Sequence, residues 1–131
     1  MLRDLFKSSV YVKVYKNKFT VKNVASNNEV VLSAVYPFTT TRLLVGEFNN
    51  AEVLLKEALK KLYADNWLSP SPIVVIQPMD MIEDGLSPVE DRILRELAIG
   101  AGARKVIVWV GKELTNEEVI EKSKTHNKAL K

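Results

Sequence analysis

The chain has 131 residues, 47% of them hydrophobic, which is the size of one ordinary domain with a substantial core. It has no cysteine, which excludes disulfides and thiolate chemistry, and its formal net charge is a modest +3. No apolar run approaches the roughly 18 residues of a membrane span, and the first ten residues lack a signal-peptide pattern, so we expect no transmembrane segment and a cytoplasmic location.

Strands are expected in the first part of the chain. Val10 to Tyr15 alternates apolar and polar residues, which is typical of a half-buried strand. The alternation resumes in Phe19 to Val24 after the polar turn Lys16 to Lys18, so we predict a hairpin. Glu29 to Tyr36 is a third expected strand, ended by Pro37 because proline cannot donate to a ladder.

Helices and strands alternate in the second part. Ala51 to Ala64 has apolar residues at helical spacing, and Asn50 is the expected N-cap. Ile73 to Ile76 is a short β-branched run typical of a strand covered on both faces. Lys105 to Val110 is expected to be a second strand of this kind.

Two helix starts carry a stronger signal. Ser87 followed by Pro88 and Glu90 predicts a capping box with proline at the first helical position. Gly100 and Gly102 suit the end of that helix, where a positive φ is often required.

A second capping box, Thr115 with Glu118, predicts a terminal helix. There is no repeat and no internal linker. We therefore expect one domain over residues 1–120, followed by a lysine-rich, disordered tail over 121–131. A nucleic-acid binder usually arrays Lys and Arg along one face with aromatic residues between them. No such stripe is visible, so we expect no nucleic-acid partner.

The order βββαβαβα predicts the α/β class, with an antiparallel hairpin region leading through right-handed crossovers into parallel strands. This is the pattern of a mixed five-stranded sheet with helices packed on it. It matches the ribonuclease-H-like unit on which actin-like ATPase subdomains are also built. Fold alone does not decide function, so the chemistry needs separate evidence.

The residues provide little for catalysis. The one histidine, His126, lies in the polar ending, and without cysteine a zinc site is not expected. Carboxylates gather in the chain at Asp80, Glu83, Asp84, Glu90 and Asp91. They could hold Mg²⁺, but helix capping and an exposed loop explain them better. No glycine-rich loop is placed to bind phosphate. We expect no catalytic residue, no cofactor and no metal site.

Three stretches resemble the bacterial actin homologue MreB. "LSPSPIVVIQP" and "SPVEDRILRELAIGAGARKVIVWV" are similar to the family's strand, "T-x-V-E-R-R-A" helix and "A-G-A-x-x-V" strand. "RLLVGEFNNAEVLLKEAL" is similar to its "G-V-I-A-D-F-x-x-T-E-x-M-L" connector and helix, with Val45, Gly46, Glu47, Phe48 and Glu52 in corresponding places. The match covers roughly residues 43–110. The resemblance implies the N-terminal (IA) subdomain of the actin fold.

The departures from that family fall on its active site. The phosphate loop "D-L-G-T-A-N-T" of MreB is replaced by "SSVYVKVYKNKF", which has neither Asp nor Gly. Where the family continues its strand with "E-E-P-M-A-A-A", this chain has Val110, Gly111 and Lys112. The resemblance therefore implies the fold without the nucleotide-binding motifs, and no catalytic residue is carried over.

Two classes of function follow. The favoured one is a non-catalytic, MreB-related domain that acts by protein–protein interaction or self-assembly in bacterial cell shape or in envelope or pilus assembly. The alternative is a nucleotide-binding or ATPase component whose site is completed by a dimer mate or partner protein. Glu90, Asp91 and Arg92 would be the first candidates there. Any small-molecule ligand is left unknown.

Five residues form the candidate interaction surface: Trp67, Met79, Met81, Ile82 and Trp109. Exposed apolar side chains of this kind recruit partners. For both tryptophans the competing interpretation is a place in the core or a capping role. For the loop that contains the two methionines, it is folding back over the core.

Overall fold

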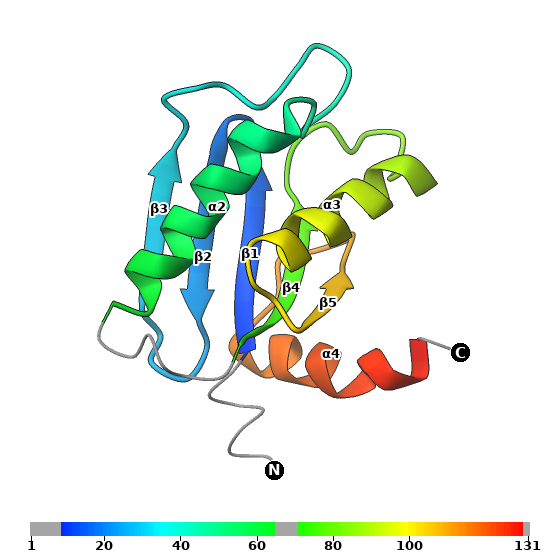
Figure 1. Ribbon diagram of the computed structural model, residues 1–131. Helices are drawn as coiled ribbons and strands as arrows, with labels where there is room; N and C mark the ends of the chain where they lie inside the picture. Colours follow the sequence, from blue (N-terminus) through cyan, green and yellow to red (C-terminus); the bar gives the residue numbers. More distant parts are fainter. Residues whose placement is uncertain (1–8, 65–70, 130–131) are drawn as a thin grey trace.

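The computed structural model describes residues 9–64 and 71–129, and the order of its elements agrees with the predicted βββαβαβα (Figure 1). Its elements are β1 (Ser9–Tyr15), β2 (Lys18–Asn23), β3 (Glu29–Ser33), α2 (Phe48–Leu62), β4 (Ile73–Pro78), α3 (Pro88–Gly100), β5 (Lys105–Val108) and α4 (Asn116–Ala129). None of the helices described is long and apolar enough to cross a membrane.

The five strands form one mixed sheet in the order β3-β2-β1-β4-β5. β1 pairs with β2, and β2 with β3, in antiparallel ladders. β4 lies parallel to β1 on one side and to β5 on the other. The predicted mixed five-stranded sheet is therefore confirmed. α3 joins the parallel neighbours β4 and β5, which a tight turn cannot link, and α2 lies in the connection that carries the chain from β3 past β2 and β1 to β4.

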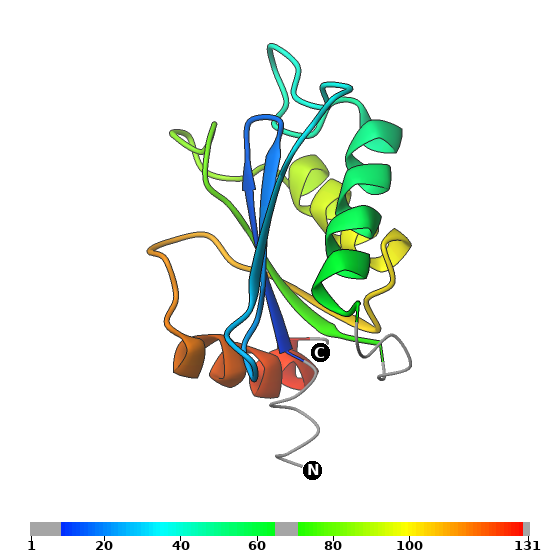
Figure 2. The same cartoon turned by 90° about the vertical axis from the view of Figure 1, so that its left-hand side faces the viewer.

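The main core lies between the sheet and the helices α2 and α3, which cover one face (Figure 2). Side chains alternate across a strand, so every second residue points into this layer. Val10, Val12 and Val14 of β1 do so, as do Val74 and Ile76 of β4, and all five are fully buried. The apolar run Ile73 to Ile76 of β4 fits the strand's position between two parallel neighbours.

The opposite face of the sheet is covered by α4, which packs against β1, β4 and β5 (Figures 1 and 2). A smaller core forms there from Tyr11, Val24, Val75, Leu114 and Val119. This helix crosses one end of the sheet in Figure 2, and among the described residues no helix is packed over the β2–β3 part of this face as α2 is on the other.

Helix α2 corrects one prediction. It begins at Phe48, its N-cap is Glu47 without a side-chain bond, and Asn50 is already inside the first turn. The Asn50 amide instead donates to the Pro37 carbonyl at 2.9 Å. A tertiary contact with the connector thus uses the side chain that would otherwise have capped the helix.

Two strands are shorter than predicted. β3 ends at Ser33 instead of Tyr36, and β5 ends at Val108, which leaves Trp109 just beyond its strand. The ladder bond from the Ala34 N–H to the Asn17 carbonyl is the last one at that end of β3.

Both predicted capping boxes are confirmed. Ser87 and Glu90 exchange bonds at the start of α3, with Pro88 at the first position, and Thr115 and Glu118 do so before α4. Gly102 has φ +122, as a helix end requires.

Gly100 instead is helical, and the space a side chain would need there is occupied by Glu52 of α2. Helix α4 continues to Ala129, so residues 121–129 are helical where a disordered tail was predicted. Val119 and Ser123 explain the continuation, since both are buried one turn apart on the face toward the sheet. Residues 130–131 lie outside the described residues, and the division at residue 120 stays a prediction.

Candidate functional site

Ligands of parallel α/β sheets bind beyond the carboxyl ends of the strands. In this protein three segments meet that edge: the turn between β1 and β2, the loop after β4 and the loop after β5. Each begins with polar groups that a phosphate or another anion could use. The hydrogen bonds of these groups therefore determine what the edge can bind.

The β1–β2 turn is occupied by the protein's own side chains. The Lys16 N–H donates to the Asp80 carboxylate at 2.8 Å, and the Asn17 N–H donates to the Thr39 hydroxyl at 3.0 Å. The Asn17 side chain in turn accepts the N–H groups of Phe38 and Thr39, both at 2.8 Å. The two turn N–H groups that a phosphate loop would offer to an anion are thus already satisfied within the chain.

The loop after β4 folds back onto the main core. Met79 donates its N–H to the Val14 carbonyl at 2.8 Å and continues the line of β4. Met81 has φ +58, and its half-buried side chain packs against the core. Met81 and Ile82 line a recess whose cavity volume is about 10 Å³, which has room for no more than about one water.

Trp109 belongs to the other face of the sheet. It packs against the smaller core, and its indole N–H donates to the Lys112 carbonyl at 2.8 Å. The Lys122 ammonium of α4 lies 3.8 Å from the centre of its ring, within range of a cation–π interaction. Trp67 lies outside the described residues.

The predicted interaction surface is therefore not one surface in the structure. Met79, Met81 and Ile82 stay together, whereas Trp109 packs beneath the opposite face of the sheet. Whether the loop contacts a partner stays a prediction. Of the two interpretations of the loop, the structure supports the one in which Met81 caps the core.

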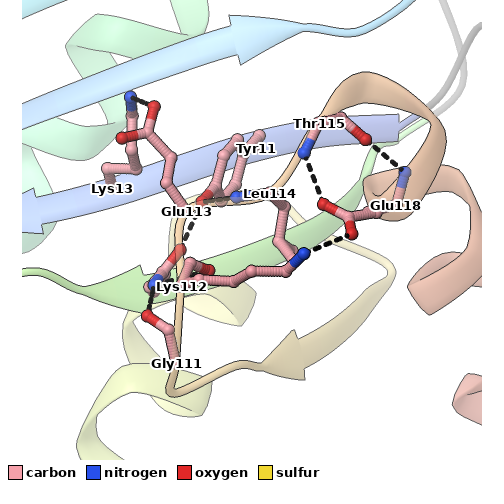
Figure 3. A network of polar contacts seen from close by, with 9 residues as sticks. Tyr11, Lys13, Gly111, Lys112, Glu113, Leu114, Thr115 and Glu118 are labelled. Atoms are coloured by element: carbon pink, nitrogen blue, oxygen red, sulfur yellow. Dashed lines mark hydrogen bonds and ion pairs between the residues drawn. The ribbon is translucent and has the colours of Figure 1, made fainter.

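The loop after β5 is held by a buried polar network that the sequence analysis missed (Figure 3). Gln77 is fully buried on β4; its amide donates to the Gly111 carbonyl at 2.7 Å and to the Lys112 carbonyl at 3.3 Å. The Tyr11 hydroxyl donates to the Gln77 side-chain oxygen and accepts the Leu114 N–H at 3.0 Å. The available signal was a glutamine directly after the apolar run Ile73 to Ile76.

An ion pair joins the same loop to β1. The Lys13 ammonium lies 2.8 Å from the Glu113 carboxylate, with 12% of the lysine side chain exposed and 57% of the glutamate. The hydrogen bond from Lys13 lowers the pKa of Glu113. Burial acts to lower the pKa of Lys13, but the hydrogen bond to Glu113 and the charges of Tyr15, Glu113 and Glu29 together outweigh it, so that pKa is raised. Burial also raises the pKa of Tyr11, which keeps its hydroxyl protonated as the network requires.

The carboxylates considered for metal binding are dispersed. Asp80 accepts from the β1–β2 turn, Glu90 caps α3, and Asp91 lies 2.8 Å from Arg95. Arg92 pairs with Glu96 of the same helix at 3.3 Å. Within residues 9–64 and 71–129, no group of three His, Cys, Asp or Glu side chains is placed to hold a metal ion. Helix capping and i,i+4 pairing thus account for the residues that the ATPase alternative singled out.

These features define the chain as an α/β domain with a mixed sheet. At the carboxyl ends of its parallel strands, the backbone groups of the loops are hydrogen-bonded to the protein's own side chains. No protein-family model matches it. It is 35% identical over 103 residues to the protein YjaA of Escherichia coli (strain K12), described as uncharacterized, and the match covers 75% of this chain and 80% of YjaA. The chain belongs to the YjaA family.

The chain is also similar to a segment of MreB. It is 35% identical over 63 residues to the cell shape-determining proteins MreB of Pasteurella multocida (strain Pm70) and of Haemophilus influenzae (strain ATCC 51907 / DSM 11121 / KW20 / Rd). Each match covers 48% of this chain but 17% of the MreB protein. The similarity supports an actin-like relationship for the matched half of this chain. Only a small part of MreB is included in the match.

Proposed function

We propose that this protein is a non-catalytic, actin-like domain that acts in the cytoplasm by protein–protein contact or self-assembly. Its five-stranded sheet, in the order β3-β2-β1-β4-β5 with helices on both faces, is consistent with a ribonuclease-H-like unit of the kind found in actin-like ATPases. The partial identity with MreB, named as a cell shape-determining protein, favours a role in bacterial cell shape or envelope assembly.

The occupied β1–β2 turn is the observation that carries this proposal. In the MreB resemblance that turn corresponds to the phosphate loop. Here the Lys16 N–H is bound by the Asp80 carboxylate, so a phosphate would have to displace one anionic group to reach the same donor. A phosphate at this turn would also lie close to the negatively charged Asp80 carboxylate. The two negative charges repel, which opposes phosphate binding. The loop after β5 is likewise fixed by Gln77 and carries no carboxylate at Val110 to Lys112.

Calorimetric titration with ATP and Mg²⁺ tests the non-catalytic part. We expect no saturable heat at micromolar ligand, because no set of free N–H donors is presented at the β1–β2 turn. Micromolar binding would overturn the proposal and favour the alternative, a nucleotide-binding component completed by a mate. Asp80→Ala is a useful second variant, since it frees the Lys16 N–H without adding a charge.

Co-sedimentation with purified MreB filaments tests the contact part. We expect the wild-type chain to pellet with the filaments, and Ile82→Glu to reduce this because it places a charge in the loop after β4. Val89→Glu is the matched control, because Val89 is 65% exposed at the start of α3. Failure of the wild-type chain both to pellet and to self-associate at any concentration would overturn the proposal.

A further inference from the structure

The sheet has two edges that differ in protection. β5 is four residues long, follows Arg104, and has α3 on one face and α4 on the other. β3 has α2 packed on one face, and its ladder with β2 runs from Glu29 to Ser33 without a bulge. Proteins usually protect an edge strand with lysine, proline or a bulge. β3 contains no lysine, proline or bulge, and its one charged residue, Glu29, stands at its first position.

In β3, residues that bond to β2 alternate with residues whose backbone groups point away from β2. At the two ends of the ladder, Ala34 donates to the Asn17 carbonyl and Asn23 donates to the Asn28 carbonyl. Bonded and non-bonded pairs alternate in an antiparallel ladder, so Val30 and Leu32 also bond to β2. The residues between them, Glu29, Val31 and Ser33, therefore direct their N–H and C=O groups away from the sheet.

Apolar side chains accompany these free groups. Val31 is 56% exposed at the centre of β3. Val35 and Tyr36 follow the strand and are 84% and 73% exposed. Within residues 9–64 and 71–129 these outward groups face no further strand. Such a row of backbone groups beside exposed apolar side chains is a template for pairing with another strand.

We propose that two copies of this chain associate by antiparallel pairing of β3 with β3, about a two-fold axis at Val31. Val31 then lies opposite the partner's Val31, and Glu29 lies opposite the partner's Ser33. All six outward groups of each strand, one N–H and one C=O from each of three residues, gain partners. The two sheets join into one continuous sheet with an isologous interface.

This register is the one that pairs all three outward residues of each strand. Antiparallel pairing sets outward-directed residues opposite each other, so a slip moves by two residues and leaves one of the three residues of each strand unpaired. A slip of one residue sets outward groups against groups already bonded to β2. Because the two-fold rotation maps the outward row of Glu29, Val31 and Ser33 onto itself, a second copy supplies a matching partner for every outward group.

Charge favours the same arrangement on the open face of the sheet. Lys22 lies beside Glu29, and Lys18 lies beside Ser33, in the ladder between β2 and β3. Across the two-fold axis the row becomes Lys22, Glu29, the partner's Ser33 and the partner's Lys18. Each glutamate is thus flanked by a lysine of its own chain and, beyond the small serine, by one of the partner. The added attraction, between Glu29 and the partner's Lys18 about two strand spacings away, is weak but has the favourable sign.

This inference deepens the proposed function, on which it rests, by naming the partner and the surface. The two fail separately. Micromolar binding of ATP would overturn the non-catalytic function without affecting the pairing of β3. A strictly monomeric chain that still pellets with MreB would overturn the pairing alone.

Sedimentation velocity from about 10 µM to about 1 mM covers the range expected for a small interface. The wild-type chain is expected to shift from monomer to dimer as its concentration rises. Val31→Lys sets two lysines directly opposite each other and should weaken the dimer at least about tenfold. Val53→Lys is the matched control, since Val53 is 65% exposed on α2, and should behave as wild type. A monomeric wild type, or a dimer indifferent to Val31→Lys, overturns the proposal.

The register of the β3–β3 pairing can be tested separately by cross-linking. Because the chain has no cysteine, each introduced cysteine is the one thiol in its variant. With a short thiol-reactive cross-linker, Val31→Cys should link to itself. Glu29→Cys and Ser33→Cys should each link poorly alone and efficiently when mixed. Efficient self-linking of Glu29→Cys would overturn the two-fold axis at Val31. Circular dichroism of each variant shows whether the domain has remained folded.

Discussion

Replacing Gln77 by leucine tests whether the buried polar network holds the loop after β5. Leucine has a similar volume and suits an apolar strand, so packing changes little. The substitution removes the acceptor of the Tyr11 hydroxyl, in a residue that is 2% exposed, and the donor to the Gly111 carbonyl. The Gly111 carbonyl belongs to an exposed residue and can be hydrated. The Tyr11 hydroxyl is buried and cannot be hydrated in the same way.

The expected cost follows from the number of buried groups left unpaired, at about 1–3 kcal/mol each. Gln77→Leu strands one group, the Tyr11 hydroxyl hydrogen, and should cost about 2 kcal/mol. Tyr11→Phe strands two, the Gln77 oxygen and the Leu114 N–H, and should cost about 3–4 kcal/mol. The double variant strands only the Leu114 N–H. It should therefore cost less than the two single changes together, by about 3–4 kcal/mol, because two fewer groups are stranded.

Urea unfolding of the four proteins measures these differences. Tryptophan fluorescence reports on Trp109, which bonds to the Lys112 carbonyl within the loop, together with Trp67, and circular dichroism follows the whole domain. Coincident transitions would support two-state analysis. Gln77→Leu should lower the urea midpoint by roughly 1–2 M at an unchanged slope.

Additivity would refute the reasoning. If the costs of Gln77→Leu and Tyr11→Phe add to within about 0.5 kcal/mol, the bond between the two side chains contributes nothing. A Gln77→Leu variant as stable as the wild type would mean that the network does not hold the loop at all.

The remaining predictions concern single contacts. Ser87→Ala should cost about 1 kcal/mol in urea unfolding because it removes half of the capping box of α3, and no loss would mean that the Pro88 turn alone sets the helix start. Glu113→Gln should cost less than about 1 kcal/mol near neutral pH, since the pair with Lys13 is partly exposed. Because the pKa of Glu113 is lowered in the fold, this difference should vanish as the pH falls through that pKa; a difference that persists at about pH 2 would contradict the ion pair. Burial raises the pKa of Tyr63 to about 12, and its hydroxyl has no partner among the described residues, so Tyr63→Phe should be neutral or stabilising by up to about 1 kcal/mol and should remove the loss of stability between about pH 10 and 12. A clear destabilisation by Tyr63→Phe would show that the hydroxyl is bonded.

Features that depend on neighbouring residues in the chain were predictable. The capping box at Ser87 needs only Glu90 three residues later, and the alternation of Val10 to Tyr15 reflects a strand with two different faces. The Asn50 cap was predicted by the same reasoning and was wrong, because the Pro37 carbonyl, distant in sequence, accepts its amide.

The candidate site divides in the same way. The sequence alone indicated that phosphate-loop residues are missing from the first hairpin, since Asp and Gly are absent there. It could not show that Asp80 occupies the Lys16 N–H, since that bond spans 64 residues. Nor could it separate Trp109 from Met81, because the face on which each packs depends on the path of the chain around the sheet.

The sequence by itself therefore determined the elements, their order and most of their ends, because periodicity and capping act over a few residues. Tertiary structure alone decided which polar groups remain unpaired. In the sequence, Gln77 is a polar residue without an evident partner in a buried strand. The structure places Tyr11 and the Gly111 carbonyl beside it as hydrogen-bond partners. Val31 reads as an ordinary strand residue until the strand order puts β3 at an edge. Both depend on contacts between distant segments, which local patterns do not encode.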